Sequence, residues 1–252
     1  MKKWFIRTVR KLGYEIVKTG GPVQLPVDFD PIHREIYEKV QDRTMTSPER
    51  IYSLIEAVKY IGRNNIPGAI VECGVWKGGS MMAAAKTLLR DGDTTRELFL
   101  YDTFEGMSEP GALDKTRKGE IASGLLAGNT DKEKNLIWAF STLETVKAGM
   151  TTTGYPETKV HYVRGKVEDT IPGTMPGEIA ILRLDTDWYE STRHELVHLF
   201  PLLTRGGVLI LDDYGHWQGA RAAVDEYFDQ YRQPILLNRI DETGRIAIKT
   251  PG

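Results

Sequence analysis

The sequence predicts an α/β protein whose mainly parallel sheet is covered by helices on both faces. Short apolar segments alternate with helical segments along the chain, and parallel strands need such helical connections. One segment, 69–75, is a continuous apolar run broken only by Glu72, as expected for a strand buried on both faces. Two final segments, 234–240 and 245–249, flank Glu242-Thr243-Gly244 and indicate a hairpin that adds an antiparallel edge strand.

The individual elements follow from apolar spacing and from residues that start or stop helices. We expect a helix to begin after Ser47, because Ser47 can cap it, Pro48 suits the first helical position and Glu49 favours its positive end. The other expected helices lie at 33–41, 81–89, 132–148, 189–203 and 217–231. The expected strands before the hairpin lie at 69–75, 97–103, 159–165, 179–186 and 207–212.

Composition narrows the class of protein. The chain has 252 residues, 40% of them apolar, and a formal net charge of −2. These values are ordinary for a globular protein, and they offer no general attraction for nucleic acid. A single cysteine, Cys73, excludes an intrachain disulfide and a cysteine zinc cluster. We therefore expect a cytoplasmic protein.

The N-terminal segment, residues 1–30, differs from this average. Residues 1–18 hold six Lys or Arg against one acid, and their apolar residues fall near one helical face. Such a helix can touch an anionic membrane surface, or it can pack on its own domain or on a sister subunit. We favour packing and expect a homo-oligomer, a dimer or larger. A linker then leads to a second region, residues 31–252, that forms the main domain.

A glycine-containing loop follows the first expected strand. It reads Gly74-Val75-Trp76-Lys77-Gly78-Gly79-Ser80 and matches neither GxGxxG nor GxxxxGK[ST]. Glycines at this place let a ligand approach the backbone, and the next helix offers free N–H groups. Asp102 ends the second expected strand, where an acid commonly accepts ribose hydroxyl groups. The two features together indicate a nucleoside-containing cofactor.

Four carboxylates follow the fourth and fifth expected strands: Asp185, Asp187, Asp212 and Asp213. A helix between these strands makes them parallel, so their carboxyl ends share one edge of the sheet. Carboxylates crowded there would repel one another and raise each other's pKa. A divalent cation that prefers oxygen ligands, namely Mg²⁺, Mn²⁺ or Ca²⁺, relieves that repulsion. The pattern therefore predicts a metal site.

Three motifs of the chain resemble the macrocin O-methyltransferase (TylF) family over roughly residues 45–249. They are Asp102-Thr103-Phe104-Glu105-Gly106, Leu184-Asp185-Thr186-Asp187-Trp188-Tyr189 and Asp212-Asp213-Tyr214-Gly215-x-Trp217-x-Gly219. The resemblance implies a class I methyltransferase fold, which is Rossmann-like with a seven-stranded sheet and an antiparallel last strand. It also implies an enzyme that uses S-adenosylmethionine and Mg²⁺ or Mn²⁺ to methylate a sugar hydroxyl of a natural product or glycan.

The resemblance also assigns roles to residues of this sequence. Asp185, Asp212 and Asp213 would hold the metal, and Asp187 would be the general base. The residues that would hold the cofactor are Met45, Thr46, Glu72, Gly74, Ser80, Asp102, Thr103, Gly165, Lys166, Val167 and Asp185. Candidate acceptor-site residues are Trp188, Tyr189, Tyr214 and His216.

Two points stay open in the sequence. Neighbouring hydroxyls on a catechol or phenol can chelate the same metal, and a pyridine-nucleotide oxidoreductase or a non-catalytic nucleotide-binding module also uses a glycine loop. The missing GxGxxG and the four strand-end acids count against the last two. The loop at 105–130 is long for a structureless connection, and we expect it to act as a substrate lid.

Overall fold

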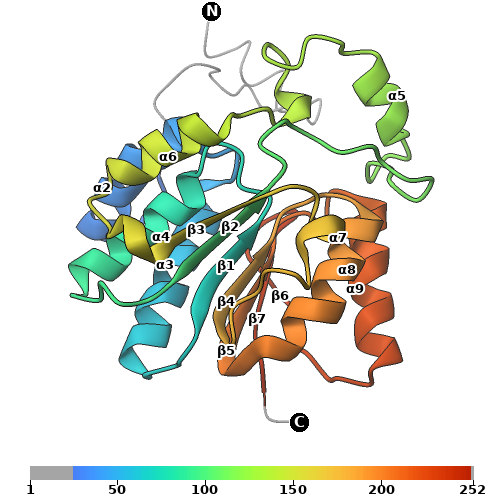
Figure 1. Cartoon of the computed structure of the whole chain (residues 1–252). Coiled ribbons are helices and arrows are strands. Elements are labelled where there is room, and N and C mark those ends of the chain that lie inside the picture. The colour runs from blue at the N-terminus through green and yellow to red at the C-terminus, as the bar shows by residue number, and fades with distance from the viewer. Residues whose placement is uncertain (1–24, 251–252) are drawn as a thin grey trace, which may run out of the picture.

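The computed structural model describes residues 25–250, and a seven-stranded sheet forms its centre (Figure 1). The strand order is β3-β2-β1-β4-β5-β7-β6, with β7 antiparallel to β5 and the first five strands parallel. The strands are β1 (Ala69–Cys73), β2 (Leu98–Asp102), β3 (Val160–Arg164), β4 (Ile179–Leu184), β5 (Leu203–Leu211), β6 (Asn238–Arg239) and β7 (Arg245–Ile248). The predicted parallel sheet with a terminal antiparallel hairpin is confirmed.

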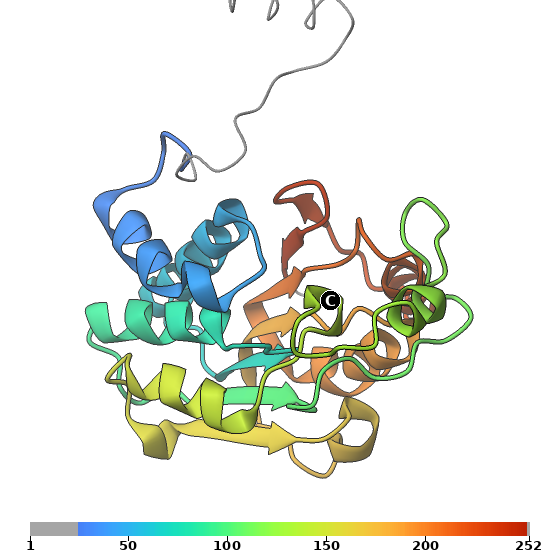
Figure 2. The same cartoon turned by 90° about the horizontal axis from the view of Figure 1, so that it is seen from above.

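Helices cover both faces of the sheet, as the two views in Figures 1 and 2 show. The α-helices are α2 (Pro31–Val40), α3 (Pro48–Arg63), α4 (Gly79–Arg90), α5 (Ala122–Ala127), α6 (Leu143–Thr151), α7 (Val167–Thr170), α8 (Tyr189–Leu199) and α9 (Gln218–Gln230). One apolar core lies between the sheet and the group α2, α3, α4 and α6, and a second lies between the sheet and the group α7, α8 and α9. Alternate residues of β1 serve the two cores: Ile70 packs in the first, and Val71 packs in the second.

The predicted start of α3 illustrates how local sequence sets an element. The Ser47 hydroxyl accepts a hydrogen bond from the Arg50 amide at 3.3 Å, and Pro48 occupies the first helical position. The buried residues of the helix include Ile51, Leu54 and Ile55, the stripe expected from the spacing. Capping and amphipathic spacing therefore act together here.

Several boundaries differ from the expected ones. The helix expected at 132–148 begins only at Leu143, because Ala139 has a left-handed φ of 43° and the Thr142 hydroxyl caps the new start. The helix expected at 189–203 ends at Leu199, and a 3₁₀ turn that contains Pro201 follows it. The 105–130 loop contains α5, which apolar spacing did not indicate.

The order of strands in the sheet places the carboxyl ends of β1 and β4 next to each other near the middle of one edge of the sheet. From β1 the sheet is built outward through β2 and β3, and then from β4 outward through β5 on the other side. Ligands of open α/β sheets bind at the carboxyl ends of the strands where this direction reverses. The register sets Cys73 beside Leu184 and Leu184 beside Leu211, so the glycine loop and both acid pairs emerge side by side.

The N-terminal arm predicted at residues 1–18, and most of its linker, lie outside the described residues. Within residues 25–250, no helix is both long enough and apolar enough to cross a membrane. The described chain begins at Leu25 with a short turn that leads into α2, where Phe29 and His33 pack against Tyr52 of α3.

Candidate active site

A cavity of about 460 Å³ opens at the carboxyl ends of β1, β2, β4 and β5. Its lining holds most residues that the sequence nominated: Met45, Thr46, Gly74, Ser80, Asp102, Thr103, Gly165, Lys166, Val167, Asp185, Asp187, Asp212, Asp213 and His216. Four nominated residues are not part of the lining: Glu72, Trp188, Tyr189 and Tyr214. The fold therefore gathers segments separated by more than 160 residues into one site.

The glycine loop forms one wall of the cavity. Gly74 has a φ of 84°, and a Cβ atom there would lie 2.0 Å from the carbonyl oxygen of Asp185. No side chain fits at that position, so glycine lets the end of β1 lie directly against the turn after β4. The loop that would receive the cofactor and the turn that carries two acids are thus in contact through their backbones.

Asp102 organises this loop. One carboxylate oxygen accepts hydrogen bonds from the amides of Val75 at 2.7 Å and Trp76 at 3.0 Å, and the other accepts one from Phe104 at 2.7 Å. Burial raises the pKa of Asp102, although these hydrogen bonds oppose the shift. The sequence suggested a carboxylate turned to ribose hydroxyls. The structure shows a group that ties the glycine loop to the end of β2.

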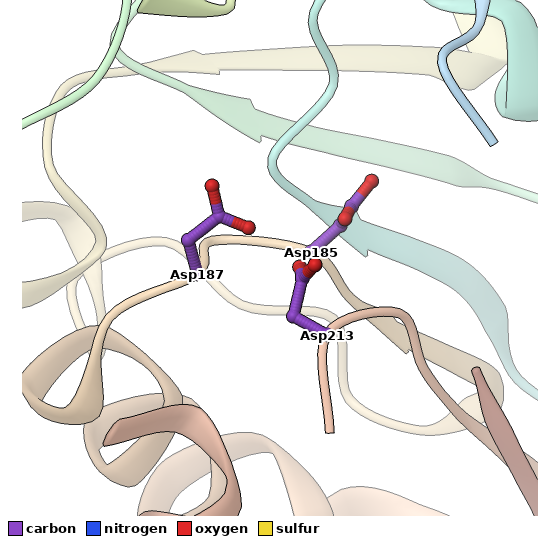
Figure 3. Close-up of side chains that lie close together, drawn as sticks. All are labelled: Asp185, Asp187 and Asp213. Carbon is purple, nitrogen blue, oxygen red and sulfur yellow. The ribbon is translucent and has the colours of Figure 1, made fainter. Parts of the chain in front are cut away.

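Three of the four strand-end acids form a cluster at the base of the cavity. Each of Asp185, Asp187 and Asp213 places a carboxylate oxygen within 4.8 Å of the others, and Figure 3 shows them converging from the turn after β4 and the segment after β5. Burial raises the pKa of Asp187 to about 7; it also raises the pKa values of Asp185 and Asp213. The Oδ2 atom of Asp213 is buried and has no hydrogen-bond partner. An all-oxygen donor set with an unpartnered buried oxygen fits Mg²⁺ or Mn²⁺.

Asp212 differs from the other three. Its Oδ1 accepts a hydrogen bond from Nη2 of Arg183 at 2.5 Å, and its Oδ2 pairs with Nη1 of Arg50. The expected arrangement gave Asp212 to the metal, whereas here both of its oxygens face arginines. Thr46, which was expected near the cofactor, also donates to Asp212 Oδ1 at 3.3 Å.

Sequence reasoning missed two arginines that pair with the strand-end acids: one is Arg50, and the other is Arg183. Arg183 is 3% exposed and also contacts Glu72 and Asp185, each at 2.7 Å. Burial alone would lower its pKa, but the three carboxylates outweigh burial and raise it. A signal existed in the sequence: Arg183 precedes Asp185 by two residues in a strand, which places both side chains on one face. Its pairing also explains why Glu72 lies outside the cavity lining.

The loop at 105–130 and the residues after it line one side of the cavity. Met107, Leu136 and Ile137 line it from this segment, and Trp217 lines it from the start of α9. Asp114, which is fully buried, accepts a hydrogen bond from the amide of Tyr189 at 2.8 Å. This contact caps α8, so the loop is attached to the helix that follows the acid-bearing turn.

The candidate acceptor residues have different positions. The ring of Trp188 packs edge-on against the ring of Trp217, with 4.9 Å between the ring centroids. Its Nε1 donates a hydrogen bond to the carbonyl oxygen of Ser108 at 3.1 Å. The hydroxyls of Tyr189 and Tyr214 donate to acids of α9, Glu226 and Asp225, each at 2.6 Å. His216 alone among the four lines the cavity, and burial, Arg117 and Arg50 lower its pKa.

The start of α3 is joined to the tip of the C-terminal hairpin. Asp241 accepts hydrogen bonds from Nε of Arg50 and from the hydroxyl of Ser47, each at 2.7 Å. Burial would raise the pKa of Asp241, but Ser47, the amide of Gly244 and Arg50 together lower it to about 2. Since Arg50 also pairs with Asp212, this contact connects the segment that carries Met45 and Thr46 to the base of the cavity.

We expect Asp241→Asn to lower the free energy of unfolding at pH 7 by about 2 kcal/mol. The Asp241 side chain is 17% exposed, so solvent screens the pair only in part. The pKa of Asp241 is lower in the folded protein than in the unfolded chain. The ionised side chain therefore stabilises the fold at pH values above about 4, and this stabilisation is lost as the pH falls toward about 2. Urea unfolding at pH 7 and pH 3 measures the loss in the free energy of unfolding of this variant. The control is Asp131→Asn, because Asp131 forms an exposed ion pair with Lys134. An equal deficit at both pH values would contradict the assignment.

A family model described as macrocin O-methyltransferase (TylF) matches residues 32–247. A Streptomyces olivaceus protein, 8-demethyl-8-(2,3-dimethoxy-alpha-L-rhamnosyl)-tetracenomycin-C 4′-O-methyltransferase, is 35% identical over 205 residues, which cover 80% of this chain and 73% of that protein. Mycinamicin III 3″-O-methyltransferase of Micromonospora griseorubida is 29% identical, covering 80% and 76%. The solved structure of the O-methyltransferase NovP superimposes with a TM-score of 0.72 at 29% identity, covering 83% of each chain.

Proposed function

Because the chain belongs to the macrocin O-methyltransferase (TylF) family and is therefore an O-methyltransferase of class I fold, we propose that it methylates a sugar hydroxyl of a glycosylated natural product. The family decides between the enzyme classes that the sequence left open, in favour of methyl transfer over an oxidoreductase. One observation carries the proposal: the carboxylate cluster lies in the same cavity as the glycine loop, with an apolar cover on the acceptor side.

S-adenosylmethionine is the proposed methyl donor, held along the wall that the glycine loop and Asp102 form. The glycines leave room for the ligand beside the backbone, and the start of α4 offers free N–H groups. Met45 and Thr46 border the same cavity from the segment before α3. These groups fix the donor so that its methyl group and the acceptor oxygen meet in near-attack geometry.

Asp185 and Asp213 are proposed as metal ligands, since both the strand-end pattern and the cluster geometry include them. Asp212 is the proposed third ligand and can offer Oδ2 once the Arg50 guanidinium moves off that oxygen, while Arg183 keeps Oδ1. A bound divalent cation supplies Lewis acidity that lowers the pKa of coordinated hydroxyls.

Asp187 is the proposed general base. A sugar hydroxyl is a poor acid, so its proton must leave as the oxygen attacks the methyl group. Asp187 lies in the cavity beside the proposed ligands Asp185 and Asp213, where a general base must lie to take the proton of a hydroxyl held at the metal. His216 lines the same cavity but has a lowered pKa, which makes it the weaker base.

The relatives and the lining of the cavity support the choice of acceptor. The two curated relatives described above are named for a rhamnosyl-tetracenomycin and for mycinamicin III. The acceptor side of this cavity is lined by Met107, Leu136, Ile137 and Trp217, which suits the apolar body of a glycoside more than a free polar sugar. We also propose the cytoplasm as the compartment. The expected homo-oligomer stays a prediction.

A methyl-transfer screen tests the function. The purified full chain is incubated with S-adenosylmethionine, with and without Mg²⁺, against glycosides of apolar aglycones, nucleotide sugars and catechols. We expect a methylated glycoside, detected by mass spectrometry together with S-adenosylhomocysteine, and only in the presence of the metal. Transfer to catechols alone would contradict the sugar assignment, because the same metal site would then serve an aromatic diol.

A further inference from the structure

Glu195 is a buried carboxyl group with no place in the reaction proposed above. It lies on α8, one helical turn from the core residue Leu199, and its exposed fraction is 0%. It does not line the cavity. A buried carboxyl group lowers the stability of the fold unless it is hydrogen-bonded or neutral. The role of Glu195 therefore depends on the group that it contacts in the folded protein.

The partner is the turn between the two strand-end acids of β4. The hydroxyl of Thr186, which lies between Asp185 and Asp187, donates to Glu195 with distances of 3.0 Å to Oε1 and 3.2 Å to Oε2. Glu195 therefore joins the first turn after β4 to α8.

The turn itself is tightly constrained on its backbone side. The amide of Asp185 donates to the carbonyl of Cys73 at 2.8 Å, and the amide of Trp188 donates to the carbonyl of Thr186 at 2.8 Å. Asp187 has a φ of 70°, a left-handed conformation that needs support from its surroundings in a residue other than glycine. The Thr186 hydroxyl supplies a side-chain contact that sets how this turn lies on α8.

We propose that Glu195, acting through Thr186, is a positioning residue that aims the carboxylates of Asp185 and Asp187 into the metal and proton-transfer site. The inference rests on the metal site of the proposed function. Glu195 touches neither the acceptor nor the cofactor cavity; it acts by holding the residue between two functional acids. Groups that orient metal ligands in this way commonly change metal affinity or activity by about 10–100-fold when they are removed.

The test is binding of Mn²⁺ to the full chain, measured by calorimetry in Thr186→Val and Thr186→Ser. Valine keeps the shape of threonine and removes the hydroxyl, whereas serine keeps the hydroxyl. We expect Thr186→Val to raise the Mn²⁺ Kd by about 10–100-fold and Thr186→Ser to bind as the unchanged protein does. Glu195→Gln should also bind normally, because its amide oxygen can still accept the hydrogen bond. S-adenosylhomocysteine should bind to all of them with similar affinity.

A matched control separates positioning from general stability. Thr87 of α4 is fully buried and donates to the carbonyl of Ala83 at 2.8 Å, outside the cavity. Thr87→Val should lower the melting temperature and leave the Mn²⁺ Kd unchanged. Normal Mn²⁺ binding by Thr186→Val would overturn the positioning role of Glu195 but not the metal assignment. An equal loss of Mn²⁺ affinity in Thr87→Val would do the same. Failure of the unchanged protein to bind Mn²⁺ would overturn the metal assignment as well.

Discussion

Asp187→Asn is expected to lower kcat by about 10²–10⁴-fold while the affinities for Mg²⁺ and S-adenosylmethionine stay close to those of the unchanged protein. Asparagine keeps the size and nearly the shape of the side chain, but it cannot accept the proton of the attacking hydroxyl. The measurement is kcat at several Mg²⁺ concentrations, combined with calorimetry for the cofactor. The same variant should melt no lower than the unchanged protein, because burial raises the pKa of Asp187 and so makes its ionised form costly in the folded state.

Two other roles for Asp187 predict different results. If Asp187 were a metal ligand, as its place in the carboxylate cluster allows, Mg²⁺ would bind more weakly and excess Mg²⁺ would restore the rate. If it capped α8, stability would fall by about 1 kcal/mol with little kinetic effect. The structure already assigns the cap to Asp114, which accepts from the Tyr189 amide. Rescue of the rate by excess Mg²⁺ would therefore show that Asp187 is a metal ligand and not the base. A normal rate in Asp187→Asn would show that His216 or water accepts the proton.

Removal of the divalent cation is expected to abolish measurable methyl transfer, and added Mg²⁺ or Mn²⁺ should restore it. Lewis-acid stabilisation contributes several kcal/mol, so we expect a loss of at least about 10²–10³-fold in EDTA. Asp185→Asn, Asp212→Asn and Asp213→Asn should each weaken Mn²⁺ binding in calorimetry. Cofactor binding should survive in Asp213→Asn, because Asp213 contacts neither the glycine loop nor Asp102 in the hydrogen bonds described.

A surface acid provides the control for these variants. Asp225 of α9 accepts from the Tyr214 hydroxyl outside the cluster, and Asp225→Asn should leave Mn²⁺ affinity unchanged. Full activity in EDTA would contradict the metal assignment. Normal Mn²⁺ binding by Asp212→Asn alone would contradict only its role as third ligand and would leave it as the partner of Arg50 and Arg183.

The sequence predicted the sheet because its signals are local. Apolar runs such as 179–184 and capping residues such as Ser47 act within one turn or one strand, and the structure confirms both. The less accurate predictions arose where tertiary contacts choose the conformation. The start of α6 moved to Leu143, and the 105–130 loop gained α5 because Ala122 and Leu126 pack against Trp188 and Trp217.

The sequence by itself determined which chemical groups reach the functional edge. Parallel strands end on one side of a sheet, so Gly74, Asp102, Asp185 and Asp213 had to meet there once the strands were identified. The tertiary structure alone decided which side chains at this edge pair with one another. Arg50 approaches Asp212 from 162 residues away in the chain, and Glu195 reaches Thr186 only because α8 folds back on the strand before it. Pairing between distant side chains depends on the packing of whole elements, which no local pattern contains.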